Sequence, residues 1–415
     1  LYIIMSFILF PTQLFELAYI PKKYRNHHFY LIEHPRFYGK KFNKKKIILH
    51  KASSLSYIDK MKNFINKKKK KNYPNVNEIV AFEPVDKVLC DEIFNKYKKV
   101  DILQTPNFVS DLYVLKEYYD IHKTKKRFFH SDFYAYQLKK HNIPYINKSY
   151  DVENRDALPE VLNNFSFPKE NMNKYVKEAI IFVEKNYGSN YGDTDNFYLP
   201  IDHDQAKKWF KNFIKHKMHK FAKYQDAIVP EEPFMYHSVI SPAMNIGLIN
   251  PGYMLKKIID AYRKKMISIK DYEAFVRQIV GWREYQRFIY LFLSDKIKSL
   301  NHFNNKNKLS KAWYEGTLGI PPVDDAIKMA FKYGFLHHIL RLMVMCNFMN
   351  LCGIEPKEVY KWMMEFSTDS YEWVMIGNVY SMGMWSDGGM TMRKPYISSS
   401  NYIKIMTGNR YGKGE

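Results

Sequence analysis

Cysteine is scarce in this sequence of 415 residues, which contains only Cys90, Cys346 and Cys352. Three thiols are too few for a disulfide framework, and none belongs to a Cys-x-x-Cys pair of the kind that builds a four-cysteine zinc site. Long apolar runs are also missing, since none approaches the roughly 18 residues that a membrane-spanning helix needs. We therefore expect an intracellular, cytoplasmic protein that does not act at a membrane, or a nuclear one if the source is eukaryotic or viral.

The sequence begins with Leu rather than Met, and its first ten residues are almost all apolar. No basic segment precedes this run and no small-residue cleavage site follows it, so we expect a buried first strand rather than a signal peptide. Met5 is a candidate start, and a partial reading frame is the alternative.

Acidic residues are outnumbered, with 42 Asp and Glu against 65 Lys and Arg, which gives a formal net charge of +23. Aromatic residues make up 17% of the chain. Cations pair with phosphates and aromatic rings stack on bases, so a nucleic-acid partner is one explanation. Codon bias of an AT-rich genome is the other. The run Lys67–Lys71 is likewise either a solvated helix end or a patch for nucleic acid or a membrane surface.

Five apolar runs in the first third predict β-strands: Met5–Phe10, Phe29–Ile32, Ile47–His50, Glu78–Phe82 and Asp101–Leu103. Segments between them have helical spacing, and this alternation indicates a parallel α/β sheet. A Gly-x-Gly-x-x-Gly dinucleotide fingerprint is absent. Any ligand of such a sheet would bind beyond the C-terminal ends of its strands.

The rest of the chain differs in composition from the first third and falls into two parts. Residues 139–204 are polar and rich in Asn, Asp, Pro and Tyr, which indicates a connector. Later apolar residues recur at helical spacing through Ala206–Phe221, Tyr272–Leu293, Asp324–Leu351 and Pro356–Phe366. We therefore predict an α/β domain with a Rossmann-like sheet at 1–138, a connector at 139–204 and an all-α domain at 205–415.

Two stretches of the helical part carry groups suited to phosphate. In YHSVISPAMNIGL, the residues Ser238, Ser241 and Asn245 surround a helix start, which suits either phosphate binding or simple N-capping. In RQIVGWREYQR, Arg283 and Arg287 share a helix face, while Trp282 could stack on a planar ring. The alternative for the second stretch is an amphipathic helix with a surface Arg–Glu pair.

Two further stretches suggest proton transfer and a large planar cofactor. His337 and His338 stand beside Arg341 in an otherwise apolar helix, where a histidine is either a proton donor or a satisfied core residue. Between Tyr371 and Tyr396, polar groups lie among tryptophans and methionines, and paired glycines permit close approach of the backbone to a ligand. The polar groups of this stretch are Glu372, Asn378 and Asp387.

These motifs, SPAMNIGL, RQIVGWREYQR, HHILRLM, DGG and KPYISSSNYI, together resemble the prokaryotic photolyase–cryptochrome family. Its members include bacterial (6-4) photolyases, related cryptochromes and deoxyribodipyrimidine photolyase-related proteins, and they often carry an iron–sulfur cluster. FPTQL and YDVENRDALP agree more weakly in the N-terminal half. The resemblance implies an antenna domain followed by a helical FAD-binding domain. It also implies light-driven electron transfer from reduced flavin to a lesion flipped out of UV-damaged DNA.

The resemblance assigns roles position by position. Flavin contacts fall on Ser238, Ser241, Gln278, Arg283, Asp387 and Gly388. We add Asn245, Trp282, Arg341, Glu372 and Asn378 from their chemistry. The lesion pocket falls on His337, His338, Asp151, Leu342 and Tyr396. Electron transfer falls on Trp362, with Trp313 and Tyr314 as outer steps, and a ribityl-lumazine antenna on Gln13 and Glu33.

Two departures from the family pattern matter. The cluster cysteines are missing from the matching segments, which here contain GIPPV and TGNRYGKGE, so we predict no iron–sulfur cluster and no bound metal. The family's last helices are also missing, which suggests a truncated or reduced homologue. The second departure is Met375, which stands where some relatives have a carboxylate near the flavin.

Three functions remain open on the sequence. The first is a monomeric (6-4)-type photolyase, and the second is a cryptochrome that senses blue light without repairing DNA. The third is a remnant without flavin.

Overall fold

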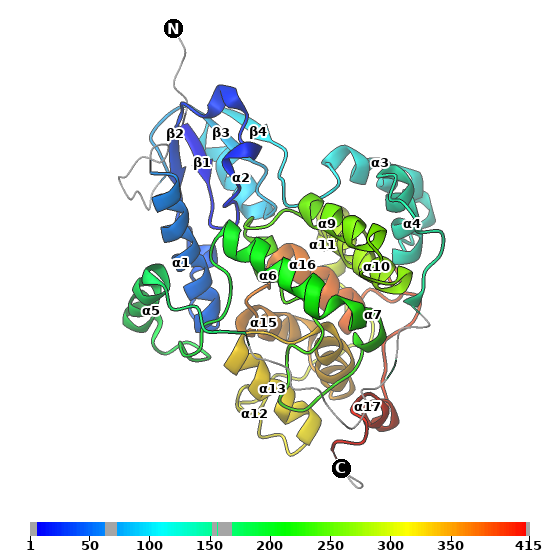
Figure 1. The fold of residues 1–415 in the computed structure, drawn as a ribbon. Coiled ribbons are helices and arrows are strands. Elements are labelled where there is room, and N and C mark those ends of the chain that lie inside the picture. The colour runs from blue at the N-terminus through cyan, green and yellow to red at the C-terminus, as the bar shows by residue number, and fades with distance from the viewer. Residues whose placement is uncertain (1–5, 63–72, 152–155, 157–167, 412–415) are drawn as a thin grey trace. The chain divides into compact units, whose positions relative to one another are not determined.

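The computed structural model describes residues 6–62, 73–151, 156 and 168–411 (Figure 1). The chain forms two compact units, each built from separate segments. Unit 1 comprises Leu1–Asp111, Pro168–Phe210 and Ile240–Met254, and unit 2 comprises Leu112–Phe167, Lys211–Val239 and Leu255–Glu415. The run Lys67–Lys71 lies outside the described residues.

Unit 1 contains a parallel sheet whose described strands have the order β2-β1-β3-β4. The strands are β1 (Ser6–Leu9), β2 (His28–Leu31), β3 (Glu78–Phe82) and β4 (Lys99–Leu103). Ser6 aligns with His28 on one side and with Ile79 on the other. β1 is buried along its whole length, as expected for a parallel strand covered on both faces. The predicted parallel α/β architecture is confirmed here.

The predicted strand at Ile47–His50 is wrong, because these residues lie within helix α1 (Lys44–Lys60). The side chain of Asn43 caps the helix by accepting a hydrogen bond from the backbone N–H of Lys45. Polar residues of α1 are buried together with apolar ones, so its sequence lacks the one-sided apolar stripe that marks a helix. Lys45, for example, is 2% exposed and pairs with Asp193 at 2.5 Å, 148 residues away.

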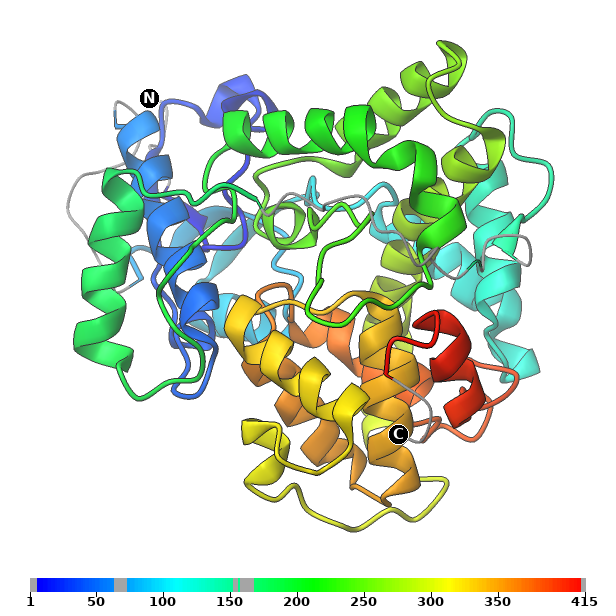
Figure 2. The same cartoon turned by 60° about the horizontal axis from the view of Figure 1, so that its bottom comes forward.

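The remaining helices of unit 1 include one within the predicted connector. They are α2 (Lys87–Lys96), α5 (Lys174–Tyr187) and α8 (Ser241–Asn245), with the beginnings of α6 (His203–His216) and α9 (Pro251–Arg263). α5 packs alongside α1, as Figures 1 and 2 show. The composition of residues 139–204 did not predict this helix.

Unit 2 is helical in its described residues. Its helices are α3 (Leu112–His122), α4 (His130–Lys140), α7 (Phe221–Tyr224), α10 (Ile269–Val276), α11 (Glu284–Lys298), α12 (Ala312–Glu315), α13 (Pro321–Tyr333), α14 (Asn347–Leu351), α15 (Pro356–Phe366), α16 (Glu372–Ile376) and α17 (Ser400–Met406). α15 has the predicted bounds. The predicted segment Asp324–Leu351 is interrupted because Gly334, with a φ of 62°, ends α13 in the left-handed conformation.

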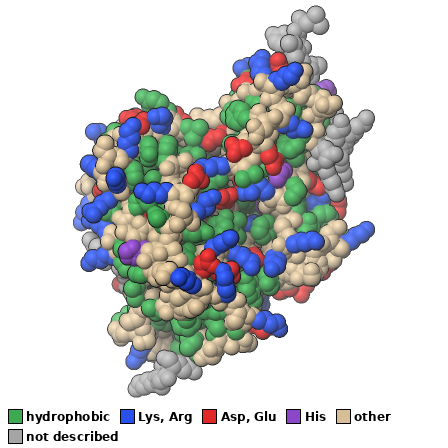
Figure 3. Space-filling view, turned by 180° about the vertical axis from the view of Figure 1, so that it is seen from behind, with side chains coloured by type: hydrophobic (Ala, Val, Ile, Leu, Met, Phe, Trp, Pro, Cys, Tyr) green, Lys and Arg blue, Asp and Glu red, His purple; other side chains and the backbone are tan. Residues whose placement is uncertain are grey.

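Basic side chains on the face drawn in Figure 3 are dispersed among acidic and apolar ones. That dispersal gives no single basic patch on this face. Among the described residues, no helix combines the length and the apolar character that crossing a bilayer requires.

His50 gives the first prediction, which concerns acid stability. Its side chain is fully buried, and burial lowers its pKa to about 3, assisted by nearby Lys46. The unfolded chain, with an ordinary pKa near 6.5, therefore binds the proton more readily, and stability falls as the pH drops below about 6.5. Between pH 7 and pH 5, His50→Phe should lose about 2 kcal/mol less free energy of unfolding than the wild type.

Urea unfolding at the two pH values measures this difference. His216→Phe, at the exposed end of α6, is the matched control and should keep the wild-type dependence. An unchanged pH dependence in His50→Phe would show that His50 does not titrate on unfolding.

Candidate active site

Three π-helical segments among the described residues carry many of the predicted site residues. They are η7 (Arg277–Arg283), η8 (Leu340–Cys346) and η9 (Gly377–Gly383). Segment η7 continues directly into α11, η9 packs against α11, and η8 packs against η9. The π-helix is rare and frequent at functional sites, because the wider turn redirects side chains. This clustering therefore marks one region of unit 2 as the candidate site.

Arg283 is a buried cation of this region. Its guanidinium lies 4.8 Å from the ring centroid of Trp373, and burial together with neighbouring Arg287 lowers its pKa to about 9. Glu284 offsets part of this shift. Two buried guanidiniums beside one carboxylate favour a bound anion, because an anion would stabilise the charged form of both. The alternative interpretation, a surface Arg–Glu pair, is wrong, since the side chains of Arg283, Glu284 and Arg287 are all buried.

Asn378, on η9, accepts a hydrogen bond of 3.5 Å from Gln286 Nε2 and donates one to the carbonyl of Val374. Asp387 lies in a turn, where its carboxylate accepts hydrogen bonds from Gly389 N and from the N–H and hydroxyl of Thr391. Burial raises the pKa of Asp387, and these hydrogen bonds offset part of the rise.

Gly388 follows Asp387 with a φ of 62°. A Cβ there would come within 2.9 Å of His302 Nδ1, so glycine is required both for the backbone conformation and for the space.

Arg341 is held by an ion pair that the sequence did not predict. Its Nη1 donates to Asp369 Oδ1 at 2.9 Å, and its Nε donates to the carbonyl of Leu336 at 2.7 Å. The hydroxyl of Ser367 also donates to Asp369 at 2.5 Å. The only sequence signal was a polar Ser-Thr-Asp-Ser stretch directly after α15. The pair fixes the guanidinium beside His338, whose pKa it lowers.

The two adjacent histidines have different surroundings. His337 is 1% exposed, and its ring stacks on that of His237 at 4.7 Å with an interplanar angle of 7°. His338 is exposed, yet desolvation and Arg341 lower its pKa to about 4, while Asp151 raises it. His337 is closed off, whereas the exposed side chain of His338 is accessible from outside, so His338 is the histidine that a ligand can reach.

Asp151, which lies near His338, belongs to a network of two carboxylates around one arginine. Its Oδ1 lies 2.9 Å from Arg277 Nη2, and Arg277 Nε lies 3.2 Å from Oε1 of the fully buried Glu273. The backbone N–H of Tyr150 donates to the second oxygen of Glu273. Arg277 thus bridges two carboxylates and orients Asp151. Glu273 was missed, because a glutamate on a helix gives no signal of burial.

Trp282 has a protein partner for its ring. It stacks on His130 at 3.6 Å with an interplanar angle of 8°, and burial lowers the pKa of His130 to about 3. Whether Trp282 also contacts a cofactor stays a prediction.

Trp362 is fully buried and donates a hydrogen bond from its indole Nε1 to the backbone carbonyl of Trp313 at 2.8 Å. Its ring lies 4.7 Å from Phe366 and 5.7 Å from Phe331, and Phe331 in turn lies 5.9 Å from Tyr314. The three predicted electron-transfer residues are therefore neighbours through one hydrogen bond and one shared phenylalanine. Their roles remain predictions.

The other predicted residues lie as follows. Glu372 forms an ion pair with Lys298, Leu342 is buried in η8 and Tyr396 is 37% exposed. Gln278 lies on η7 and Ser238 belongs to unit 2, whereas Ser241 and Asn245 belong to α8 in unit 1. The N-cap of α8 is Ile240 without a side-chain cap, so capping does not explain Ser241.

The two antenna candidates lie just beyond the C-terminal ends of β1 and β2. The side-chain amide nitrogen of Gln13 donates to the carbonyls of Phe82 and Glu83, so both amide hydrogens are used in hydrogen bonds within the protein. Glu33 pairs with Lys51 at 2.6 Å. Gln13 thus ties the end of β1 to the end of β3, and antenna binding stays a prediction for both residues.

These residues fit the flavin that the resemblance implies. Arg283 and Arg287 suit its phosphates, while Asn378 and Asp387 offer hydrogen-bonding groups beside the paired glycines. Within the described residues, no group of three or more His, Cys, Asp or Glu could hold a metal ion. The absence of an iron–sulfur cluster stays a prediction.

Comparisons with known proteins identify similar sequences and a similar fold. Residues 275–407 match the family model described as the FAD binding domain of DNA photolyase, and residues 63–199 match the model of deoxyribodipyrimidine photo-lyase-related protein. A (6-4) photolyase of Agrobacterium fabrum is 34% identical over 260 residues, which are 62% of this chain and 51% of that protein. The chain thus spans about half the length of this relative.

Two further relatives extend the comparison. An uncharacterized protein of Acanthamoeba polyphaga mimivirus is 49% identical over 113 residues, which are 27% of this chain and 85% of that protein. The crystal structure of a cryptochrome from Synechocystis sp. PCC6803 superposes with a TM-score of 0.66 at 12% identity, covering 97% of this chain and 88% of that one. The likeness to that structure supports the fold alone.

Proposed function

Because the chain belongs to the photolyase–cryptochrome family, we propose that it repairs DNA in light by reversing (6-4) pyrimidine photoproducts. The observation that carries the proposal is His338, an exposed but desolvated histidine near Asp151 and Arg341. A (6-4) lesion needs a proton donor beside the flipped-out bases, and an imidazole that a ligand can reach supplies one. The (6-4) photolyase relative supports the same lesion class.

In this proposal, each group of the site has one task. Reduced FAD, when bound, would supply the electron that light releases. Arg283 and Arg287 would neutralise its phosphates, while Asn378 and Asp387 would orient it through hydrogen bonds.

On the lesion side, His338 would hold a proton at a ring nitrogen, and Asp151, oriented by Arg277, would stabilise the charged imidazolium. Trp362 would pass electrons inward to regenerate the reduced cofactor.

The test is repair of an oligonucleotide that carries a single (6-4) photoproduct. Chemically reduced protein, illuminated with blue light, should convert it to intact bases, as chromatography of the products would record. The same mixture in the dark is the control. An absorption spectrum of the purified protein first verifies the flavin, and a colourless protein would favour the third function, a flavin-free remnant.

A cryptochrome that senses light without repair is the second candidate. One observation favours it, because the pKa of His338 near 4 leaves the imidazole neutral at neutral pH when no DNA is bound. Flavin that reduces in light, together with no repair by fully reduced protein, would support this candidate and contradict the proposal.

A further inference from the structure

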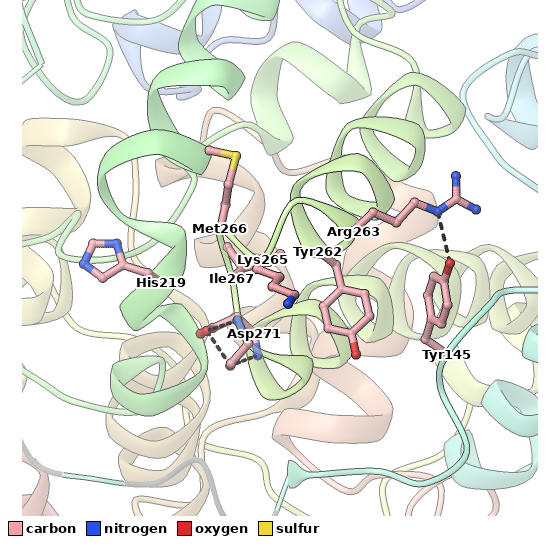
Figure 4. A pocket seen from close by; sticks show the side chains of 9 residues that line it. Tyr145, His219, Tyr262, Arg263, Lys265, Met266, Ile267 and Asp271 are labelled. Atoms are coloured by element: carbon pink, nitrogen blue, oxygen red, sulfur yellow. Dashed lines mark hydrogen bonds between the residues drawn. The ribbon is translucent and has the colours of Figure 1, made fainter.

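Outside the candidate active site, unit 2 has a surface pocket of about 620 Å³. It lies where the end of α9 and the start of α10 meet a short 3-10 helix, η6 (Met218–Lys220) (Figure 4). The residues around it include Tyr145, His219, Tyr262, Arg263, Lys265 and Met266. The volume is in the range of small-molecule sites.

Aromatic rings form one side of the pocket. Tyr262 stacks on Tyr272 at 5.0 Å with an interplanar angle of 14°, and the ring of Tyr145 lies 5.3 Å from Tyr262. Tyr272 is anchored by its hydroxyl, which donates to the carbonyl of Pro144. Tyr145 is 50% exposed and keeps a φ of 69°, which is unusual for a bulky residue. The fold therefore holds a half-exposed ring in a fixed place, ready to stack on a flat ligand.

The rim of the pocket is basic. Arg263 ends α9 and Lys265 follows two residues later, and His219 lies on the opposite side. The Nε of Arg263 donates to the hydroxyl of Tyr145 at 3.1 Å, as the dashed line in Figure 4 marks, which ties the cation to the ring.

The carboxylate that lines the pocket does not cancel this charge at its mouth. Asp271 is 4% exposed, and its oxygens accept hydrogen bonds from Ser268 and from the backbone N–H of Ala222. Cations beside exposed aromatic rings are the combination that binds a nucleotide, since the phosphate meets the charge and the base meets the ring.

The pocket is linked to the candidate active site through α10. Tyr145 leads along the chain to Asp151, which pairs with Arg277 just after α10, while Ser268 caps the other end of that helix. At a rise of about 1.5 Å per residue, the nine residue steps from Ser268 to Arg277 span roughly 14 Å along the helix.

We propose that this pocket binds one nucleotide of a DNA strand that also reaches His338 and Asp151. The base stacks on Tyr145 and Tyr262, and the phosphate lies against Arg263 and Lys265. The choice of DNA as the source rests on the proposed function, because a free mononucleotide offers the same chemistry.

The test measures binding of a labelled, undamaged single-stranded oligonucleotide in the dark, by fluorescence anisotropy at several salt concentrations. Tyr145→Ala should raise the Kd about fivefold or more, since stacking is lost. Arg263→Ala should weaken binding and reduce the salt dependence by about one counterion. The matched controls are Tyr113→Ala, an exposed tyrosine of α3, and Lys264→Ala, an exposed cation that does not line the pocket. Both should change the Kd far less.

Equal effects of pocket and control variants would overturn the proposal. Competition with deoxyadenosine monophosphate distinguishes a DNA strand from a free mononucleotide as the ligand. A mononucleotide that binds as tightly as the oligonucleotide would overturn the proposal that the ligand is a DNA strand. Arg263 is exposed, so Arg263→Ala tests the pocket even if Tyr145→Ala fails to fold. The assay needs neither a lesion nor light. Failure to repair a (6-4) photoproduct would therefore count against the proposed function alone, whereas the Tyr145 and Arg263 variants decide whether the pocket binds DNA.

Discussion

His338→Ala is expected to reduce repair of a (6-4) photoproduct by pre-reduced protein at least about 100-fold, the usual contribution of a positioned proton donor. The flavin should stay bound, because the cationic and amide groups proposed to hold it are on other residues. The side chain of His338 is exposed, so its removal should cost little stability. The measurement is the yield of intact bases per unit of blue light, normalised to the flavin absorbance of each variant.

The control for this variant is His216→Ala, which removes an exposed histidine from the end of α6. A second readout is the pH profile. A DNA phosphate near His338 would raise the pKa of its imidazole from about 4, so wild-type repair should fall as the pH rises through the pKa of the complex. Full repair by His338→Ala would show that another group donates the proton.

Trp362→Phe is expected to remove most of the photoreduction of the flavin while leaving repair by pre-reduced protein intact. Phenylalanine fills most of the same buried space but is far harder to oxidise, and it cannot donate the hydrogen bond to the carbonyl of Trp313. The rate at which the oxidised flavin band bleaches under blue light measures the first effect. The oligonucleotide repair assay with chemically reduced protein measures the second.

The matched control is Trp209→Phe, which changes a tryptophan of α6 in the same way but away from Trp362 in sequence and element. It should bleach at the wild-type rate. If Trp362→Phe also bleaches at the wild-type rate, electrons enter by a route that does not use Trp362, and Tyr314 next to Phe331 becomes the first residue to change.

Much of the fold could be predicted because the pattern of apolar residues along the chain agrees with the residues that the structure buries. The run Glu78–Phe82 is apolar and buried, and it forms β3 with the same bounds. Helix α15 likewise matches Pro356–Phe366, since Pro lies in its first turn and apolar residues recur along one face. The prediction of a strand at Ile47–His50 was wrong because α1 buries lysines and serines as well as apolar residues. Their burial depends on partners such as Asp193, which lies far away in the sequence.

The candidate site was predicted as residue types but not as an arrangement. The motif around Arg283 indicated phosphate chemistry, yet nothing in the motif indicated that Arg283 is buried or that its guanidinium lies over Trp373. The resemblance assigned both adjacent histidines to the lesion pocket, whereas the structure stacks His337 on His237 and leaves His338 exposed. The π-helical turns were also invisible, because they follow from packing among helices rather than from local propensity.

The sequence by itself therefore determined the order of the architecture, a parallel sheet followed by helices, together with the chemical groups available to the family's flavin domain. Hydrophobic periodicity and motif spacing are local properties, so they can be recognised in the sequence without the fold. Only the tertiary structure decided which groups are desolvated and which meet. Asp151 and Arg277 are 126 positions apart, and their 2.9 Å ion pair exists because two distant segments pack together. The low pKa of His338 has the same origin, since desolvation depends on all the atoms around a group and not on its neighbours in the chain.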